Sequence, residues 1–112
     1  MKKLVSIVLL LAIVMSFCVM SVSAQDNVFS GDKSEEYYMI TFLSGIDYWK
    51  TCFKGMEDAA GYFGVTTHYT GDTTADVAKE VAVLEQVIAK KPKGIAITCV
   101  NADALQEPID EA

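Results

Sequence analysis

The chain of 112 residues contains no arginine and only one histidine, His68. Acidic residues outnumber lysines by 15 to 9, which gives a formal net charge of −6 at pH 7. The lysines are scattered along the sequence, a pattern typical of a solvated surface. Nucleic-acid binding needs a dense face of lysine and arginine. We therefore expect no nucleic-acid partner.

Motifs for the common catalytic and cofactor sites are also missing. Gly45 stands alone, without the glycine-rich loop that cradles a phosphate group. The sequence shows no Ser-His-Asp or Cys-His arrangement and no cysteine–histidine cluster with metal-ligand spacing. Its acids lack a recognisable glycosidase context. These absences favour a protein that is not an enzyme and that holds no cofactor or metal ion.

The first 24 residues predict a secretory signal peptide. Two lysines open the chain, and residues 4–20 are almost wholly apolar. Residues 21–24, SVSA, supply the small side chains that a signal peptidase needs, so cleavage is expected after Ala24. The apolar run is shorter than the ~20 residues of a usual membrane span, and an uncleaved anchor is the alternative. The pattern predicts export to the periplasm or cell envelope.

Export would leave Cys52 and Cys99 in a compartment that permits disulfides. Cys52 falls within a predicted helix, on its apolar stripe, and Cys99 ends a predicted strand. A helix and a strand in packed layers usually lie about 10 Å apart, beyond disulfide reach. We expect both cysteines to be free and buried as small hydrophobic residues, with a bridge between them as the alternative.

Strands and helices are predicted to alternate along the mature chain. Residues 25–36 are polar and predict a flexible lead-in. Apolar runs then predict strands at 37–43, 65–70 and 94–99, and helical periodicity predicts helices at 48–63, at 75–90 and from about 103 onward. Such alternation is typical of parallel strands joined by right-handed crossovers. We predict an α/β fold with three layers, αβα, around a parallel sheet.

The composition of the three runs predicts the strand order 2-1-3. Residues 37–43 lack polar alternation, which suits a central strand buried on both faces. Residues 65–70, VTTHYT, alternate and suit an edge. Residues 94–99, GIAITC, have no charge or proline to protect a free edge. We therefore expect further strands to follow in the complete protein, and residues 25–112 alone not to unfold cooperatively.

Residues at the predicted helix ends support these boundaries. Gly64 follows the first helix, where glycine commonly ends one. Pro92 prevents the second helix from continuing. Asp103, with Gln106 three residues later, resembles a capping box and predicts the start of the third helix.

The carboxyl ends of the three strands should meet at one edge of the sheet, where open α/β sheets bind ligands. The residues predicted at that edge are Asp47, Tyr48, Trp49, Asp72, Thr73, Asn101 and Asp103. Aromatic rings cover the C–H faces of a sugar, while Asp and Asn bond its hydroxyls. Trp49 also lies on the helical stripe of Phe53 and Met56, so a core role for it is equally supported. Tyr48 points elsewhere and is the harder one to explain as core.

Three stretches of the sequence resemble a known family. They are FLSGIDYW, FKGMEDAAGYFGV and VLEQVIAKKPKGIAITCVNADAL, in the order and spacing of the type I periplasmic sugar-binding proteins. The resemblance covers residues 37–112, nearly all of the mature chain. It implies a protein about three times longer, with two lobes that close on a sugar by a hinge motion. This chain would then be the first half of lobe one, a truncated N-terminal part of the domain.

The same resemblance implies a binding site. The paired aromatics after the first strand stack on the sugar in this family, a role that falls on Tyr48 and Trp49. Asp47 directly precedes them, where the commoner family pattern has an Asn-Pro pair. The loop after the third strand also approaches the ligand, which adds Asn101 and Asp103. Family members deliver their sugar to an ABC-type membrane permease or to a chemoreceptor.

The leading hypothesis is therefore an exported, non-enzymatic receptor for a monosaccharide or a related small carbohydrate. A sensor of the same fold that feeds a chemoreceptor or a membrane kinase is an alternative. An exported α/β enzyme is less favoured, because no nucleophile elbow or phosphate loop is present. A repressor of this fold is disfavoured by the signal peptide and by the lack of a basic helix-turn-helix segment.

Overall fold

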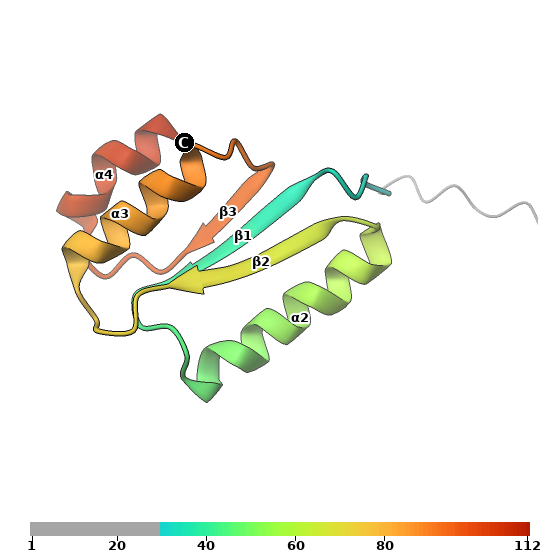
Figure 1. Cartoon of the computed structure of the whole chain (residues 1–112), viewed down its shortest axis with the longest axis horizontal. Helices are drawn as coiled ribbons and strands as arrows, with labels where there is room; N and C mark the ends of the chain where they lie inside the picture. The colour runs from blue at the N-terminus through green and yellow to red at the C-terminus, as the bar shows by residue number, and fades with distance from the viewer. Residues whose placement is uncertain (1–29) are drawn as a thin grey trace, which may run out of the picture.

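The structure of the protein is a computed structural model that describes residues 30–112. The predicted signal peptide and the first part of the lead-in lie outside the described residues. Strands and helices alternate strictly along the chain (Figure 1). They are β1 (Glu36–Thr41), α2 (Asp47–Phe63), β2 (Thr66–Gly71), α3 (Val77–Ile88), β3 (Gly94–Ile97) and α4 (Ala102–Glu111).

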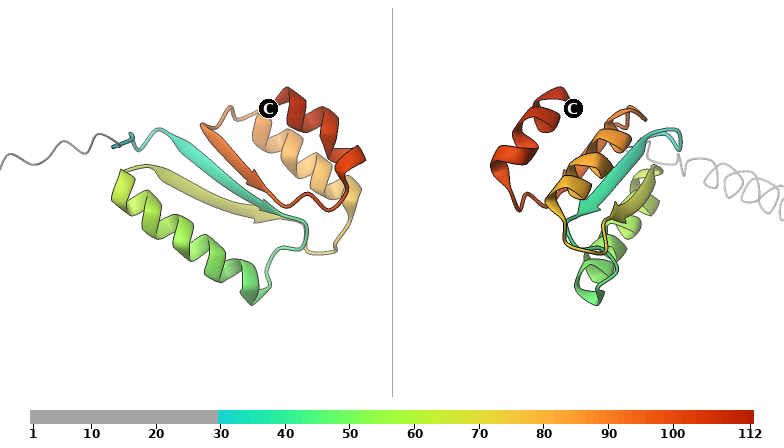
Figure 2. Two further views of the ribbon diagram at one scale, coloured as in Figure 1. Left: turned by 180° about the vertical axis from the view of Figure 1, so that it is seen from behind. Right: turned by 60° about the vertical axis from the view of Figure 1, so that its left-hand side comes forward.

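The three strands form one parallel sheet in the order β2-β1-β3. In this register Ile40 of β1 lies between Thr70 of β2 and Ile97 of β3. Helix α2 covers one face of the sheet, and α3 and α4 lie over the other (Figure 2). The predicted αβα layers and the strand order 2-1-3 are confirmed.

Strand β1 is buried on both faces, as its continuous apolar run predicts. Tyr38 and Ile40 point toward α3 and α4, where they form the main hydrophobic core with Leu84, Val87 and Leu105. The opposite face is packed less tightly. A hollow of about 500 Å³ opens there between the sheet and α2, and its walls include Tyr37, Met56, Phe63 and Val65.

Two strands end earlier than predicted. Strand β1 stops at Thr41 because the N–H of Phe42 donates to the side chain of Thr98, 2.8 Å away, and not to a neighbouring strand. Strand β3 stops at Ile97, one residue before Thr98. A side-chain acceptor thus replaces the next step of the backbone ladder, which sequence periodicity does not reveal.

The helix ends confirm the predicted signal at Gly64, add a cap at Asp76 and correct the signal at Asp103. Gly64 ends α2 in the left-handed conformation, with φ of 76°. Asp76 caps α3 by accepting from the backbone N–H groups of Ala78 and Lys79. The predicted capping box at Asp103 is wrong, because α4 begins at Ala102 and its cap is Asn101.

Both cysteines are free, as predicted, but neither is buried. Cys52 is exposed because α2 contacts the sheet along a narrow stripe, in which Phe53 and Met56 are only half-buried. Cys99 lies beyond the end of β3, outside the sheet. Within residues 30–112, no helix combines the length and the apolar character needed to cross a bilayer.

Candidate functional site

The loops that follow the three strands are joined into one rim at the carboxyl edge of the sheet. The N–H of Ser44 donates to the carbonyl oxygen of Asp72 at 2.7 Å, and the Ser44 hydroxyl donates to the carbonyl oxygen of Gly71 at 3.0 Å. On the other side, the bond from Phe42 to Thr98 links the loop after β1 to the loop after β3. The β1–α2 loop is therefore held from both neighbouring strands.

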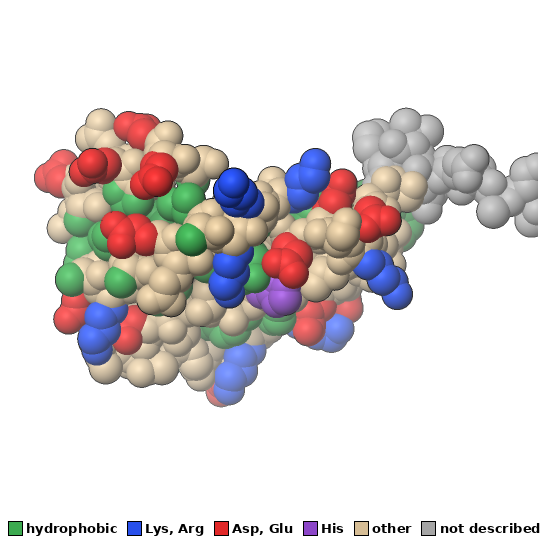
Figure 3. All heavy atoms as spheres, turned by 45° about the horizontal axis from the view of Figure 1, so that its top comes forward, with side chains coloured by type: hydrophobic (Ala, Val, Ile, Leu, Met, Phe, Trp, Pro, Cys, Tyr) green, Lys and Arg blue, Asp and Glu red, His purple; other side chains and the backbone are tan. Residues whose placement is uncertain are grey.

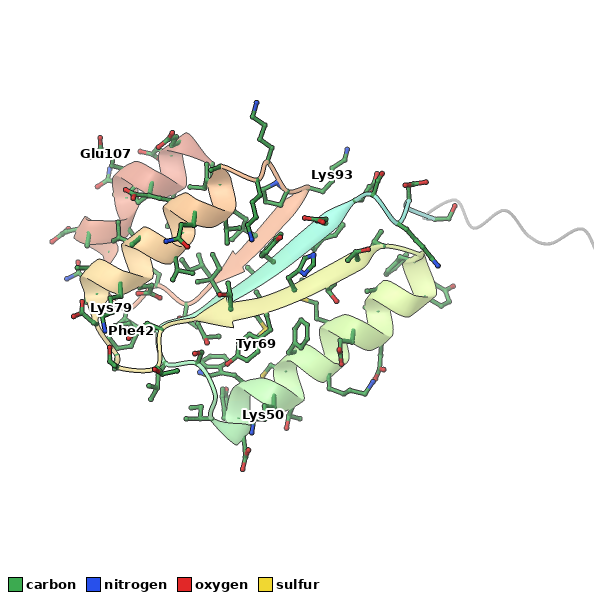
Figure 4. The ribbon with its side chains drawn as sticks, in the orientation of Figure 1. Phe42, Lys50, Tyr69, Lys79, Lys93 and Glu107 are labelled. Carbon is green, nitrogen blue, oxygen red and sulfur yellow. The ribbon has the colours of Figure 1, made fainter. Side chains whose placement is uncertain are left out.

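Tyr69 of β2 also holds the β1–α2 loop in place. Its phenol oxygen lies 3.1 Å from the Thr41 hydroxyl and accepts from the N–H of Gly45 at 3.2 Å. The ring stacks on Phe53 of α2, with centroids 5.5 Å apart (Figure 4). Gly45 has a φ of 85°, a conformation that favours glycine. These contacts fix the turn that delivers the chain to the start of α2.

Tyr48 and Trp49 lie directly after this loop, in the first turn of α2. Their rings meet edge to face, with centroids 4.7 Å apart and planes at 83°. The Tyr48 side chain is 68% exposed, so it takes no part in the core, while Trp49 is half-buried. With the planes nearly perpendicular, only one of the two rings lies flat against a given face of a ligand.

Asp47 opens α2 and is almost fully exposed. Its carboxylate accepts from Nζ of Lys50 at 2.9 Å. The pKa of Asp47 lies below its ordinary value, because Lys50 donates this hydrogen bond and its positive charge stabilises the carboxylate. Asp47 is therefore an ionised acceptor beside the aromatic pair.

The polar residues after β3 lie at the start of α4. Oδ1 of Asn101 accepts from the N–H of Ala104 at 3.0 Å, which leaves the side-chain amide as a hydrogen-bond donor. Asp103 lies in the first turn of α4 and is exposed. The hydrogen bond of Asn101 stays within the start of α4, and that of Asp47 with Lys50 stays within the first turn of α2. The rim thus presents two separate groups, the aromatic pair and the polar pair.

Asp72, also predicted at this edge, is occupied in shaping its own loop. Oδ2 accepts from both the N–H and the hydroxyl of Thr74, and Nζ of Lys79 lies 3.6 Å from Oδ1. The Thr74 hydroxyl lowers the pKa of Asp72 more than burial raises it, and the charge of Lys79 adds to the lowering. Asp72 therefore holds the β2–α3 loop closed and has little capacity left for a ligand.

Glu80 of α3 is the one acidic side chain in the core of the described residues. It is completely buried, and its Oε1 accepts from the Thr98 hydroxyl at 3.1 Å. Burial raises the pKa of Glu80, and the Thr98 hydroxyl opposes that change by bonding the charged form. This contact was not predicted from the sequence, although Glu80 lies three residues after Val77 and four before Leu84, on the apolar face of α3.

The raised pKa of Glu80 predicts a loss of stability as pH rises. The folded state keeps the Glu80 proton to higher pH than the unfolded chain, whose glutamates have a pKa near 4.5. Folding therefore becomes less favourable as the pH increases from the unfolded-state pKa of Glu80 to its higher folded-state pKa. Glu80→Gln removes the ionisation, and its stability relative to wild type should therefore increase with pH. Urea unfolding of the full-length protein and of this variant from about pH 4 to pH 8 measures the difference. An identical pH dependence of both proteins would contradict it.

Charge at the surface fits a small uncharged ligand better than a polyanion. Acidic side chains gather over α4, at the upper left of Figure 3. The acidic residues of α4 are Asp103, Glu107, Asp110 and Glu111.

Across residues 30–112, no cluster of three or more His, Cys, Asp or Glu side chains is placed to hold a metal ion.

Residues 37–112 match the family model described as the periplasmic binding protein domain. Solved structures match as well. The sugar-binding protein of a sugar ABC transporter from Bacillus halodurans is 47% identical over 69% of this chain and 28% of its own, with a TM-score of 0.63. The periplasmic sugar-binding protein of an ABC sugar transporter from Legionella pneumophila is 33% identical over 70% of this chain and 29% of its own, with a TM-score of 0.65.

A third similar structure contains a sugar. It is an ABC transporter solute-binding protein from Agrobacterium vitis bound with α-D-tagatopyranose, 30% identical over 69% of this chain and 26% of its own, with a TM-score of 0.65. This chain therefore spans less than a third of each of the three proteins. A comparison with curated proteins gives no match.

Proposed function

Because the chain belongs to the periplasmic binding protein domain family, we propose that it forms part of a receptor that binds a monosaccharide or a related small carbohydrate and delivers it to an ABC-type permease. The observation that carries this proposal is the pair Tyr48–Trp49 at the rim, where Tyr48 is largely exposed and Trp49 is half-buried against it. Three similar structures are sugar-binding or solute-binding proteins of ABC transporters, which supports the same class of ligand.

The chemistry of the rim suits a sugar. A pyranose ring offers a C–H face to one aromatic ring, and the second ring, nearly perpendicular to the first, contacts the edge of the sugar. Sugar hydroxyls can donate to the carboxylates of Asp47 and Asp103 and accept from the free amide of Asn101. All five residues lie in the first turn or the cap of a helix that follows a strand.

We further propose that these five residues form only one wall of the site. The matched part of this chain covers less than a third of each similar protein, so a second lobe that closes over the rim by a hinge motion would supply the remaining contacts. On this proposal, residues 37–112 belong to the first lobe. The signal-peptide pattern of residues 1–24 supports a location in the periplasm or cell envelope.

A calorimetric titration of the full-length protein tests the proposal. The panel contains pentoses and hexoses, with D-tagatose among them, and each mixture is analysed by chromatography for products after incubation. We expect saturable binding of at least one sugar with no product. Formation of a product would indicate an enzyme, and the absence of binding to every sugar would contradict the carbohydrate receptor.

A further inference from the structure

A partly buried chain of hydrogen bonds joins the ends of β1 and β3 to α3, behind the rim. The N–H of Phe42 donates to the Thr98 hydroxyl at 2.8 Å, and that hydroxyl donates its proton to Oε1 of Glu80 at 3.1 Å. Phe42 and Thr98 are the first residues after β1 and β3. A hydroxyl has one proton, so the orientation of Thr98 is fixed once Glu80 accepts it. The lone pairs of Thr98 then face Phe42.

Glu80 is a costly residue at this position. Its side chain has no exposed surface, and Oε2 has no hydrogen-bond partner among the described residues. A buried carboxylate with one oxygen unsatisfied destabilises the fold, and an apolar residue packed against the sheet would avoid that cost. The hydroxyl of Thr98 is the one hydrogen-bond partner of the Glu80 carboxylate within residues 30–112. The Glu80 carboxylate destabilises the fold, and the one hydrogen bond that it accepts fixes the orientation of the Thr98 hydroxyl.

Thr98 links the two loops that carry the groups of the rim. It precedes Asn101 by three residues, and its partner Phe42 precedes Tyr48 by six. We infer that Glu80, acting through Thr98, is a positioning residue that fixes the β3–α4 loop against the β1–α2 loop and so sets the distance between the aromatic pair and the polar pair. This inference rests on the proposed sugar site, because a sugar must contact both groups at once.

Substitutions of Thr98 and Glu80 in the full-length protein separate this role from simple stability. Thr98→Val removes the hydroxyl at nearly constant volume, and Thr98→Ser restores it. Glu80→Leu removes the acceptor, and Glu80→Gln keeps a carbonyl oxygen in its place. Two quantities are measured well below the unfolding temperature. They are the hydrogen-exchange rate of the Phe42 amide and the affinity for the sugar found in the panel.

We expect Thr98→Val and Glu80→Leu to accelerate Phe42 exchange and to weaken sugar binding by about tenfold each, the scale of one lost hydrogen bond. Thr98→Ser and Glu80→Gln should stay within about threefold of wild type in both measurements. Thr66→Val is the matched control. Its hydroxyl donates to the carbonyl oxygen of Lys33 at 2.7 Å, at the other end of the sheet, so its loss should leave sugar affinity unchanged.

The outcomes distinguish the inference from the function on which it rests. If Thr98→Val speeds Phe42 exchange but leaves sugar affinity at the wild-type value, the hydrogen-bond chain does not position the site and the inference is wrong. If wild type binds sugar and Thr98→Ser binds it as weakly as Thr98→Val, loss of the hydroxyl does not explain the weaker binding, and the inference is again wrong. If wild type binds no sugar at all, the proposed function fails and the inference fails with it. Should Glu80→Leu not fold, the Thr98 pair alone decides.

Discussion

Replacing Tyr48 or Trp49 by alanine is expected to weaken sugar binding by about 5- to 150-fold in the full-length protein. The corresponding free energy is on the order of 1–3 kcal/mol, the scale on which nucleobases stack on aromatic side chains. The two effects should differ. With the ring planes at 83°, one ring covers the sugar face and the other meets its edge, so the larger loss identifies the stacked ring. Calorimetric titration of each variant measures both losses.

Helix α2 offers a matched control for these variants. Tyr62 is 67% exposed, against 68% for Tyr48, and it also meets its neighbour, Phe63, edge to face. It lies at the far end of the same helix, so Tyr62→Ala should bind sugar as wild type does. Tyr48→Phe keeps the ring and should retain most of the affinity. Unchanged affinity in both Tyr48→Ala and Trp49→Ala would remove the aromatic pair from the site.

The second large effect is expected at Gly71, where the end of β2 passes very close to β1. Gly71 has a φ of 152°, and a Cβ there would collide with the carbonyl oxygen of Thr41. Gly71→Ala should lower the free energy of unfolding on the order of 1–3 kcal/mol from backbone strain alone, and more from the collision. It should also displace Ser44, whose hydroxyl bonds Gly71. Urea unfolding and sugar titration of the variant measure the two effects.

A second glycine shows whether the loss is specific to that site. Gly61 lies within α2, and no atom lies within 4 Å of the position that a Cβ would take. Gly61→Ala should therefore stabilise the protein, by up to about 1 kcal/mol of helix propensity. If Gly71→Ala were as stable as wild type, the close approach of β2 to β1 would not constrain the rim.

The layers and the strand order could be predicted because they depend on local composition. The unbroken apolar run of β1 marks a strand covered on both faces, and the threonine-rich β2 marks an edge. The exposure of Tyr48 also followed from its place on α2, off the stripe that includes Phe53. The roles assigned to Asp47, Tyr48, Trp49, Asn101 and Asp103 in sugar binding stay predictions.

Contacts between side chains and distant backbone could not be predicted. The bond from Phe42 to Thr98 joins residues 56 positions apart and leaves no periodic trace in the sequence. Tyr69 reads as one more residue of an alternating strand, although its hydroxyl supports the turn at Gly45. Asn101 and Asp103 are both good caps, and only the backbone path decides that Asn101 takes that place. Such contacts determine the shape of the site.

The bonds of Ser44, Tyr69 and Phe42 give the β1–α2 loop one conformation before any sugar arrives. A loop that is already ordered loses little conformational entropy on binding, so more of the contact energy appears as affinity. The rim is therefore preorganised by hydrogen bonds to the ends of the neighbouring strands. Adjustment to differently shaped sugars then falls to the two side chains at its free end, Tyr48 and Trp49.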